Sequence, residues 1–281
     1  MTQLHGITDD LKAAIRRRVV GLFNDKESGD APVQRSDYAL FDRRSVAWRV
    51  HGDVGAMMVG GIASLLLQML HPSVLAGVWD HSNFRRDMNG RLRRTARFVA
   101  TTTYGERMTA EALIGRVRTI HKQISGTLPD GTPYCANDPA LLSWVHVTET
   151  SSFLNAWMRY SEPFMPMNSQ DRYFEEMAQI GEALGADPVP RSRREALAIM
   201  DGARGQLRSD ERTREVARLI LGQGSPFAVS DLPRHLAERA AIDLLPSWAR
   251  KVHGFSVPMT ERHFIRAGTL GIAQTLRWAF R

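Results

Sequence analysis

The chain has 281 residues, of which 43% are hydrophobic, and carries 37 basic against 30 acidic side chains, for a net charge of +7. Its single cysteine, Cys135, excludes an internal disulfide, and its length suffices for one large domain or two small ones. The basic residues are scattered without a helix-turn-helix or RNA-binding signature, so we expect no nucleic-acid partner. Phosphate-binding loops, Cys-x-x-Cys pairs and His-Glu-x-x-His motifs are also missing from the sequence.

Residues 1–37 are predicted to form an N-terminal helix and a polar linker, separate from a domain over residues 38–281. Leu11, Ile15 and Val19 recur at helical spacing, which predicts an amphipathic helix within residues 1–28. Such a helix docks on the main domain or associates weakly with a membrane surface. The first ten residues lack the basic-then-apolar order of a signal peptide, so we expect a cytoplasmic protein.

Val54–Leu70 contains no charged residue over 17 positions and is predicted to be a buried helix. It is at the short limit for a membrane span. Gly60 and Gly61 favour the close approach of another helix or of a flat macrocycle. Pro72 restricts the preceding residue and ends the helix at His71. The His71 ring is expected to cap backbone carbonyl groups or to pack, and the alternatives are that it lines a cavity or serves as a distal metal ligand.

The segment Gly90–Ala100 is predicted to be a helix that is dense in cations. Arg91, Thr95 and Phe98 lie on one face at spacings of four and three residues. Guanidinium groups bind carboxylates through paired donors, so this face suits a ligand with carboxylates. The alternative is a basic face exposed to solvent.

Met108–Ser125 is predicted to be the next helix, with Thr109 as its N-cap and Gly126 as its stop. His121 shares a face with an apolar stripe, which consists of Leu113, Val117, Ile120 and Ile124. A neutral imidazole on a dry helical face is what a haem iron requires. The alternative is a buried histidine with ordinary hydrogen-bond partners.

After a turn-rich loop over residues 127–140, Asp138 and Pro139 are predicted to start a long helix. It carries His146, a rival for the iron, and Glu149, which is either exposed or a base whose pKa is raised by burial. Further helices are predicted over residues 170–184, 191–201, 210–221, 232–244 and 261–280. No alternating strands or repeats are found, so the predicted fold class is all-α, a single helical domain.

Six blocks of this sequence, in order and spacing, resemble the rubber oxygenase (latex clearing protein) family, which includes the oxygenase of the mycophenolic acid pathway. They are His71-Pro-Ser-Val-Leu-Ala-Gly-Val with His81-Ser-Asn-Phe-Arg, Gly90-Arg-Leu-Arg-Arg-Thr, Tyr104-Gly105, Arg118-Thr-Ile-His121, Gly126-Thr-Leu-Pro-Asp-Gly-Thr-Pro-Tyr134 and Leu141-Leu-Ser-Trp-Val-His146. The resemblance covers about Arg49–Leu221 well and the C-terminal part loosely.

This resemblance implies a globin-like helical core that binds haem b, and an activity that oxidises or cleaves C=C bonds with dioxygen. The family's proximal histidine falls on His121, and its supporting Arg-x-x-x-Thr pair falls on Arg91 and Thr95. Rubber-cleaving members have a lysine before the threonine that can cap the iron. This chain has Arg94 there, and arginine has no lone pair to give a metal. The distal glutamate of those members also lacks a counterpart, since Val74–Val78 is apolar.

We therefore expect a haem b-dependent oxygenase that acts with dioxygen on a hydrophobic small molecule bearing an alkene or aromatic group. His121 is the expected iron ligand, and the other expected haem contacts are Arg91, Thr95 and Arg118. Arg94, His71 and Glu149 are the candidate catalytic residues. The alternatives are a non-catalytic protein that binds haem or a small molecule, and a basic helical protein that binds a membrane surface or nucleic acid.

Overall fold

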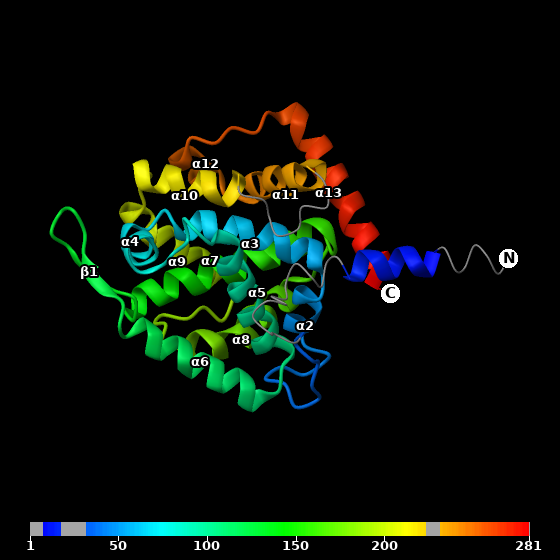
Figure 1. The fold of residues 1–281 in the computed structure, drawn as a ribbon, viewed down its shortest axis with the longest axis horizontal. Helices are drawn as coiled ribbons and strands as arrows, with labels where there is room; N and C mark the ends of the chain where they lie inside the picture. The colour runs from blue at the N-terminus through cyan, green and yellow to red at the C-terminus, as the bar shows by residue number, and fades with distance from the viewer. Residues whose placement is uncertain (1–7, 18–31, 223–230, 281) are drawn as a thin grey trace.

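The structure, a computed structural model, describes residues 8–17, 32–222 and 231–280. A short helix covers residues 8–17, and the helices that follow it in the chain stack in layers (Figure 1). They are α2 (Val46–His51), α3 (Val54–Gln68), α4 (Pro72–His81), α5 (Met88–Tyr104), α6 (Arg107–His121), α7 (Pro139–Tyr160), α8 (Met167–Leu184), α9 (Arg193–Ala203), α10 (Glu211–Gly222), α11 (Asp231–Leu244), α12 (Ser247–His253) and α13 (Met259–Phe280), with a 3₁₀ turn, η1 (Arg204–Gln206), after α9. The predicted all-α class is confirmed.

Helices α3 and α7 pack against each other at the centre of the molecule. A Cβ atom added at Gly60 of α3 would lie 2.9 Å from the Phe153 ring and 3.0 Å from the backbone carbonyl oxygen of Ser152, both on α7. This glycine therefore allows the two helices to approach closely, as predicted. The same atom at Gly61 would meet only the Phe153 ring, at 3.8 Å.

Helix α3 begins and ends close to the predicted positions. Asp53 caps it by accepting a hydrogen bond from the backbone N–H of Ala56. His71 then caps α4, since its Nδ1 accepts a hydrogen bond from the N–H of Ser73.

Among the described helices, none is by itself both long and apolar enough to cross a membrane; α3 and α4 pass that test only together, across a bend of 102°.

Helices α5 and α6 form an antiparallel hairpin, and α6 differs from its prediction at both ends. It starts at Arg107 after Glu106, so Thr109 lies inside the helix and is not its cap. It stops at His121, and Gly126 lies in strand β1 (Ser125–Thr127), which pairs with β2 (Pro133–Cys135). This two-stranded ribbon, at the left of Figure 1, corrects the expectation that the chain has no strands. Gly131, with a φ of 88°, makes its turn.

The remaining helices lie around this centre, with α10, α11 and α13 above α3 in Figure 1 and α8 and α6 below α7. Asp138 caps α7 as predicted, while α2 and α12 were not predicted as separate helices. Arg277 near the end of α13 donates a 2.6 Å hydrogen bond to Asp53, which ties the C-terminal helix to the start of α3.

The N-terminal helix over residues 8–17 lies near the C-terminal end of α13, where the Lys12 ammonium is 5.1 Å from the centre of the Trp278 ring. This contact agrees with docking on the main domain. Residues 18–31, which hold the rest of the predicted helix and part of the linker, lie outside the described residues.

Candidate functional site

The hairpin of α5 and α6 brings the first turn of α5 next to the last turn of α6. Arg91 and His121 thereby come close enough for the guanidinium charge to lower the pKa of the imidazole, a smaller effect than that of burial. A histidine with a lowered pKa is neutral at neutral pH and keeps a lone pair. The two residues predicted from separate helical patterns therefore lie close together.

The His121 ring is half-buried, and its Nδ1 atom is buried without a hydrogen-bond partner among the described residues. The rest of the predicted apolar stripe is only partly correct. Leu113, Val117 and Ile124 are half-buried, but Ile120 is 47% exposed, and Ile114 is the residue that enters the core. The stripe differs because α6 lies along the outside of the molecule and contacts the core through a narrow face.

Arg91 is a largely buried cation. Burial lowers its pKa, and the charge of Arg94 lowers it further. Within the described part of the chain, no carboxylate pairs with the Arg91 guanidinium. A buried charge normally requires a partner, so this guanidinium is suited to an anionic group from outside the described residues, such as a bound ligand.

The neighbouring predicted residues are more exposed. The Thr95 hydroxyl donates a 3.2 Å hydrogen bond to the Arg91 carbonyl oxygen and lies at the surface. Arg94 is exposed and forms an ion pair with Asp87 at 3.4 Å. Arg118 is exposed in the last turn of α6. Their predicted roles toward a cofactor or substrate stay predictions.

His71 uses both ring nitrogens in structural contacts. Its Nδ1 accepts from the N–H of Ser73 at 3.3 Å, and its Nε2 lies 3.1 Å from Gln206 Oε1. One neutral tautomer satisfies both contacts, with Nε2–H as the donor. His71 does cap a helix, but it accepts from an N–H at the start of α4, whereas the sequence predicted that it would cap carbonyl groups. Its predicted role at the catalytic centre stays a prediction.

Glu149 on α7 is partly buried, which corrects the expectation of an exposed carboxylate. Burial raises the pKa of Glu149 to about 7. Within the described residues it has neither an ion pair nor a hydrogen bond from a side chain. A carboxyl group with this pKa exchanges its proton near neutral pH, as a general acid or base must.

His146, the rival ligand, lies three residues before Glu149 on α7. Its ring packs on α8, because a Cβ atom added at Gly181 would be 3.1 Å from three atoms of the ring. Burial lowers the pKa of His146 to about 4, and its Nε2 is buried without a partner in the described structure. His146 is therefore a second neutral imidazole with an unused nitrogen.

A comparison with known protein families matches residues 48–278 to the family described as ER-bound oxygenase mpaB/B'/Rubber oxygenase, catalytic domain. The chain belongs to this family. The match covers most of the chain and extends beyond Leu221 through α13, where the resemblance had been loose. This protein is accordingly an enzyme, an oxygenase, as the sequence predicted. No curated protein and no solved structure matches it.

The sequence analysis did not predict one buried network of side-chain hydrogen bonds in this oxygenase. His51 on α2 makes 2.8 Å hydrogen bonds to Thr103 on α5 and to the hydroxyl of Tyr173 on α8. Burial lowers the pKa of His51 to about 3. Tyr173 lies close enough to Glu149 for the carboxylate charge to raise the pKa of the tyrosine, after burial as the main cause. His51 stands in a short, mixed segment whose sequence contains no signal for this network.

Further polar side chains of the oxygenase lie around the β ribbon. The Tyr134 hydroxyl donates to Asp80 at 2.9 Å and lies 3.2 Å from His81 Nε2, while Cys135 is a half-buried free thiol. Among the described residues, no three or more His, Cys, Asp or Glu side chains are grouped to hold a metal ion. A haem iron needs a single proximal histidine from the protein.

Proposed function

We propose that this oxygenase is haem b-dependent and that His121 is the iron's protein ligand. The observation that carries the proposal is the pairing of a neutral, half-buried imidazole with a largely buried guanidinium that has no carboxylate partner in the described structure. Haem presents an iron that accepts an imidazole nitrogen and propionates that accept guanidinium donors. These two side chains therefore fit both polar parts of the cofactor.

Each nearby residue has a role that follows from its chemistry. Arg91 would hold a propionate, and Thr95, whose hydroxyl bonds the Arg91 carbonyl oxygen, would support the turn that carries it. Arg118 and Arg94 are exposed cations on the same hairpin and would face the second propionate or the solvent side of the pocket. When bound, the haem would supply the activation of dioxygen.

Glu149 on α7 is the candidate catalytic residue whose chemistry best suits it to move a proton. With a pKa of about 7, its carboxyl group is close to half protonated at neutral pH. A general acid or base acts best when its pKa is near the working pH. We therefore propose that Glu149 takes or gives the proton at its carboxyl oxygen during turnover.

The substrate class follows from the family and is the expected hydrophobic molecule with an alkene or aromatic group. Membership of a family of catalytic domains favours this over a protein that only binds haem or a small molecule. Uptake of dioxygen that depends on such a substrate, recorded with an oxygen electrode, tests it. Haem binding without any uptake across alkene and aromatic substrates would favour the binding protein.

The ligand assignment is tested by the absorption spectrum of the purified protein after reconstitution with haem. We expect a Soret band in the wild type that is lost or shifted in His121→Ala. His146→Ala is the informative comparison, because its Nε2 is also unused, and His71→Ala is the control, because both of its nitrogens are engaged. An unchanged band in His121→Ala with a changed band in His146→Ala would move the ligand to α7.

A further inference from the structure

The C-terminal helices border an open cavity of about 730 Å³ that none of the candidate site residues lines. Its walls come from the C-terminal half of α7, the start of α9, the end of α11, and α12 and α13. Asp243 is the one carboxylate among the lining side chains. Five arginines also line the cavity, namely Arg159, Arg193, Arg250, Arg262 and Arg266. The lining therefore carries an excess of four positive charges.

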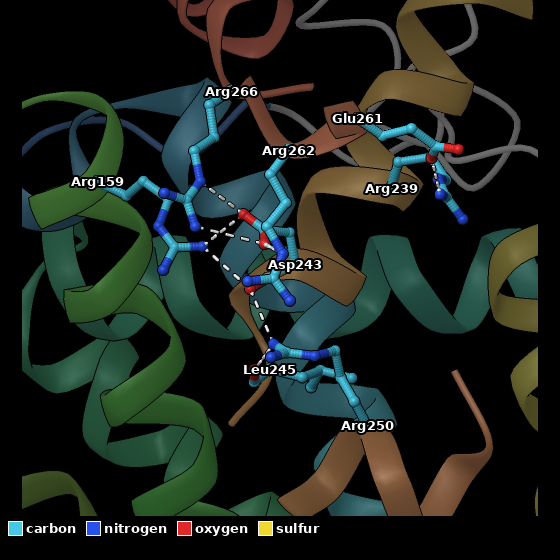
Figure 2. Close-up of polar contacts among 8 residues, drawn as sticks. All are labelled: Arg159, Arg239, Asp243, Leu245, Arg250, Glu261, Arg262 and Arg266. Atoms are coloured by element: carbon cyan, nitrogen blue, oxygen red, sulfur yellow. Dashed lines mark hydrogen bonds and ion pairs between the residues drawn. The ribbon is translucent and has the colours of Figure 1, made fainter. Parts of the chain in front are cut away.

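Asp243 is buried, with 1% of its side chain exposed, and is shared by several arginines in Figure 2. Arg159 donates to its Oδ2 at 3.1 Å and Arg266 at 2.8 Å. Arg262 Nε lies 3.4 Å from Oδ1, yet this nitrogen is buried and makes no hydrogen bond in the described structure. One carboxylate thus neutralises one guanidinium and leaves the others in excess.

Two more arginines at the cavity bond to neutral groups. Arg250 donates to the backbone carbonyl oxygens of Asp243, at 3.3 Å, and Leu245. Arg193 donates to the Gln170 side-chain oxygen. Within the described residues neither forms an ion pair. The pKa of Arg250 is lowered by burial and then by the charge of Arg262, which is the sign of like charges held close together.

We propose that this cavity binds a small molecule that bears a phosphate or diphosphate group. Guanidinium groups are planar forks that bind phosphate oxygens in pairs, and a multivalent anion offsets more of the excess charge than a second carboxylate would. The volume lies within the roughly 300–1,000 Å³ of ordinary ligand sites. Met158, Leu244, Ala267 and Leu270 also line the cavity and provide apolar surface for the rest of the ligand.

A nearby ion pair, in which one arginine has one carboxylate of its own, supplies a control. Arg239 of α11 pairs one-to-one with Glu261 of α13 and does not line the cavity (Figure 2). Arg239→Gln therefore removes one positive charge close to the cavity without changing the side chains that line it. Arg262→Gln and Arg193→Gln each remove one lining charge and leave Asp243 its bonds to Arg159 and Arg266.

The test is titration calorimetry of the full chain with inorganic pyrophosphate at constant ionic strength. We expect saturable binding to the wild type and to Arg239→Gln, and affinity lower by about tenfold in Arg262→Gln and in Arg193→Gln, since charged hydrogen bonds contribute about 1.5–3 kcal/mol. Circular dichroism and thermal melts check that each variant is folded. Two cavity variants are made so that the test still works if one of them does not fold.

The proposal would be overturned if the wild type gave no saturable heat of binding with pyrophosphate. It would also be overturned if the wild type and all three variants bound pyrophosphate with equal affinity. A second arm uses vesicles with and without phosphatidic acid, because a lipid headgroup presents the same phosphate. Binding to these vesicles that pyrophosphate does not compete would also overturn it, in favour of a membrane surface. Neither arm depends on haem, so the outcome is independent of the role proposed for His121.

Discussion

Burial lowers the pKa of the His121 imidazole, and the Arg91 guanidinium lies close enough for its charge to lower that pKa further. A cation next to a metal-binding histidine keeps the ring neutral as the pH falls. At the same time it places a positive charge where a carboxylate of a cofactor would be held. The packing of α5 on α6 thus places the proposed ligand close to a positive charge.

Arg91→Gln is expected to raise the pKa of His121 in the haem-free protein. The rise will be partial, because burial is the larger cause and is kept in the variant. A pH titration of the His121 ring signals by NMR measures it. Arg118→Gln, which removes an exposed charge from the same turn of α6, is the control. An identical His121 titration in wild type and Arg91→Gln would show that the two side chains are not coupled.

Gly60→Ala is expected to destabilise the protein by about 1–3 kcal/mol, the usual range for overpacking. The added methyl group would meet the Phe153 ring at 2.9 Å and a backbone oxygen at 3.0 Å, and backbone atoms of α7 cannot rotate away. Gly61→Ala is the matched control, since its nearest neighbour would be at 3.8 Å and alanine favours the helix by up to about 1 kcal/mol. Urea unfolding of both variants measures the difference, and equal losses would contradict the close packing of α3 on α7.

The sequence predicted those parts of the fold that follow from local chemistry. Asp138 and Pro139 mark a helix start, and Gly60 marks a close approach, because caps and glycines act within a few residues. The β ribbon was missed because Gly126 followed by a turn reads equally well as a helix stop. Ile120 was wrongly predicted to be buried, because periodicity shows which residues share a face of a helix but not how much of that face other helices cover.

For the candidate site, the sequence suggested individual residues, and their roles stay predictions. His121 and Arg91 were found from their spacing and the family resemblance, and the hairpin brings them together. The His51–Tyr173 contact joins residues 122 positions apart, and the Asp243 cavity joins five helices, so neither leaves a pattern in a single stretch of sequence. Burial of Glu149 likewise depends on which helices cover α7.

The stability of the protein is expected to fall as the pH drops below about 6.5. His51 and His146 are buried with pKa values lowered to about 3 and about 4, so the unfolded chain takes up these protons before the folded one. Their contribution is present above the unfolded pKa of 6.5 and is lost as the pH falls toward the folded values.

Each of these histidines steepens the fall by at most about 1.4 kcal/mol per pH unit. His146→Gln removes one of them and is expected to reduce the slope of unfolding free energy against pH between 6.5 and 4. Measurement at pH 8, above this window, separates any loss of packing against Gly181. A slope equal to that of the wild type would mean that His146 is already protonated in the folded protein.

Glu149→Gln is expected to stabilise the protein above pH 7 and to change it little below pH 4.5. Burial raises the folded pKa from 4.5 to about 7, so the folded chain holds a proton that the unfolded chain releases. The stability that this proton provides is complete below 4.5 and is lost as the pH rises through 7. Glutamine keeps the neutral form, so the difference between variant and wild type should grow to at most about 3 kcal/mol.

Denaturant unfolding of Glu149→Gln and wild type at pH 4.5, 6 and 8 measures this difference. Glu175→Gln, which removes a charge from the exposed face of α8, controls for the change in net charge. A variant that gains nothing at pH 8 would mean that the Glu149 carboxylate is solvated in the folded state. In the same variant, oxygen uptake should lose its dependence on a group of pKa near 7, because the amide neither takes nor gives a proton.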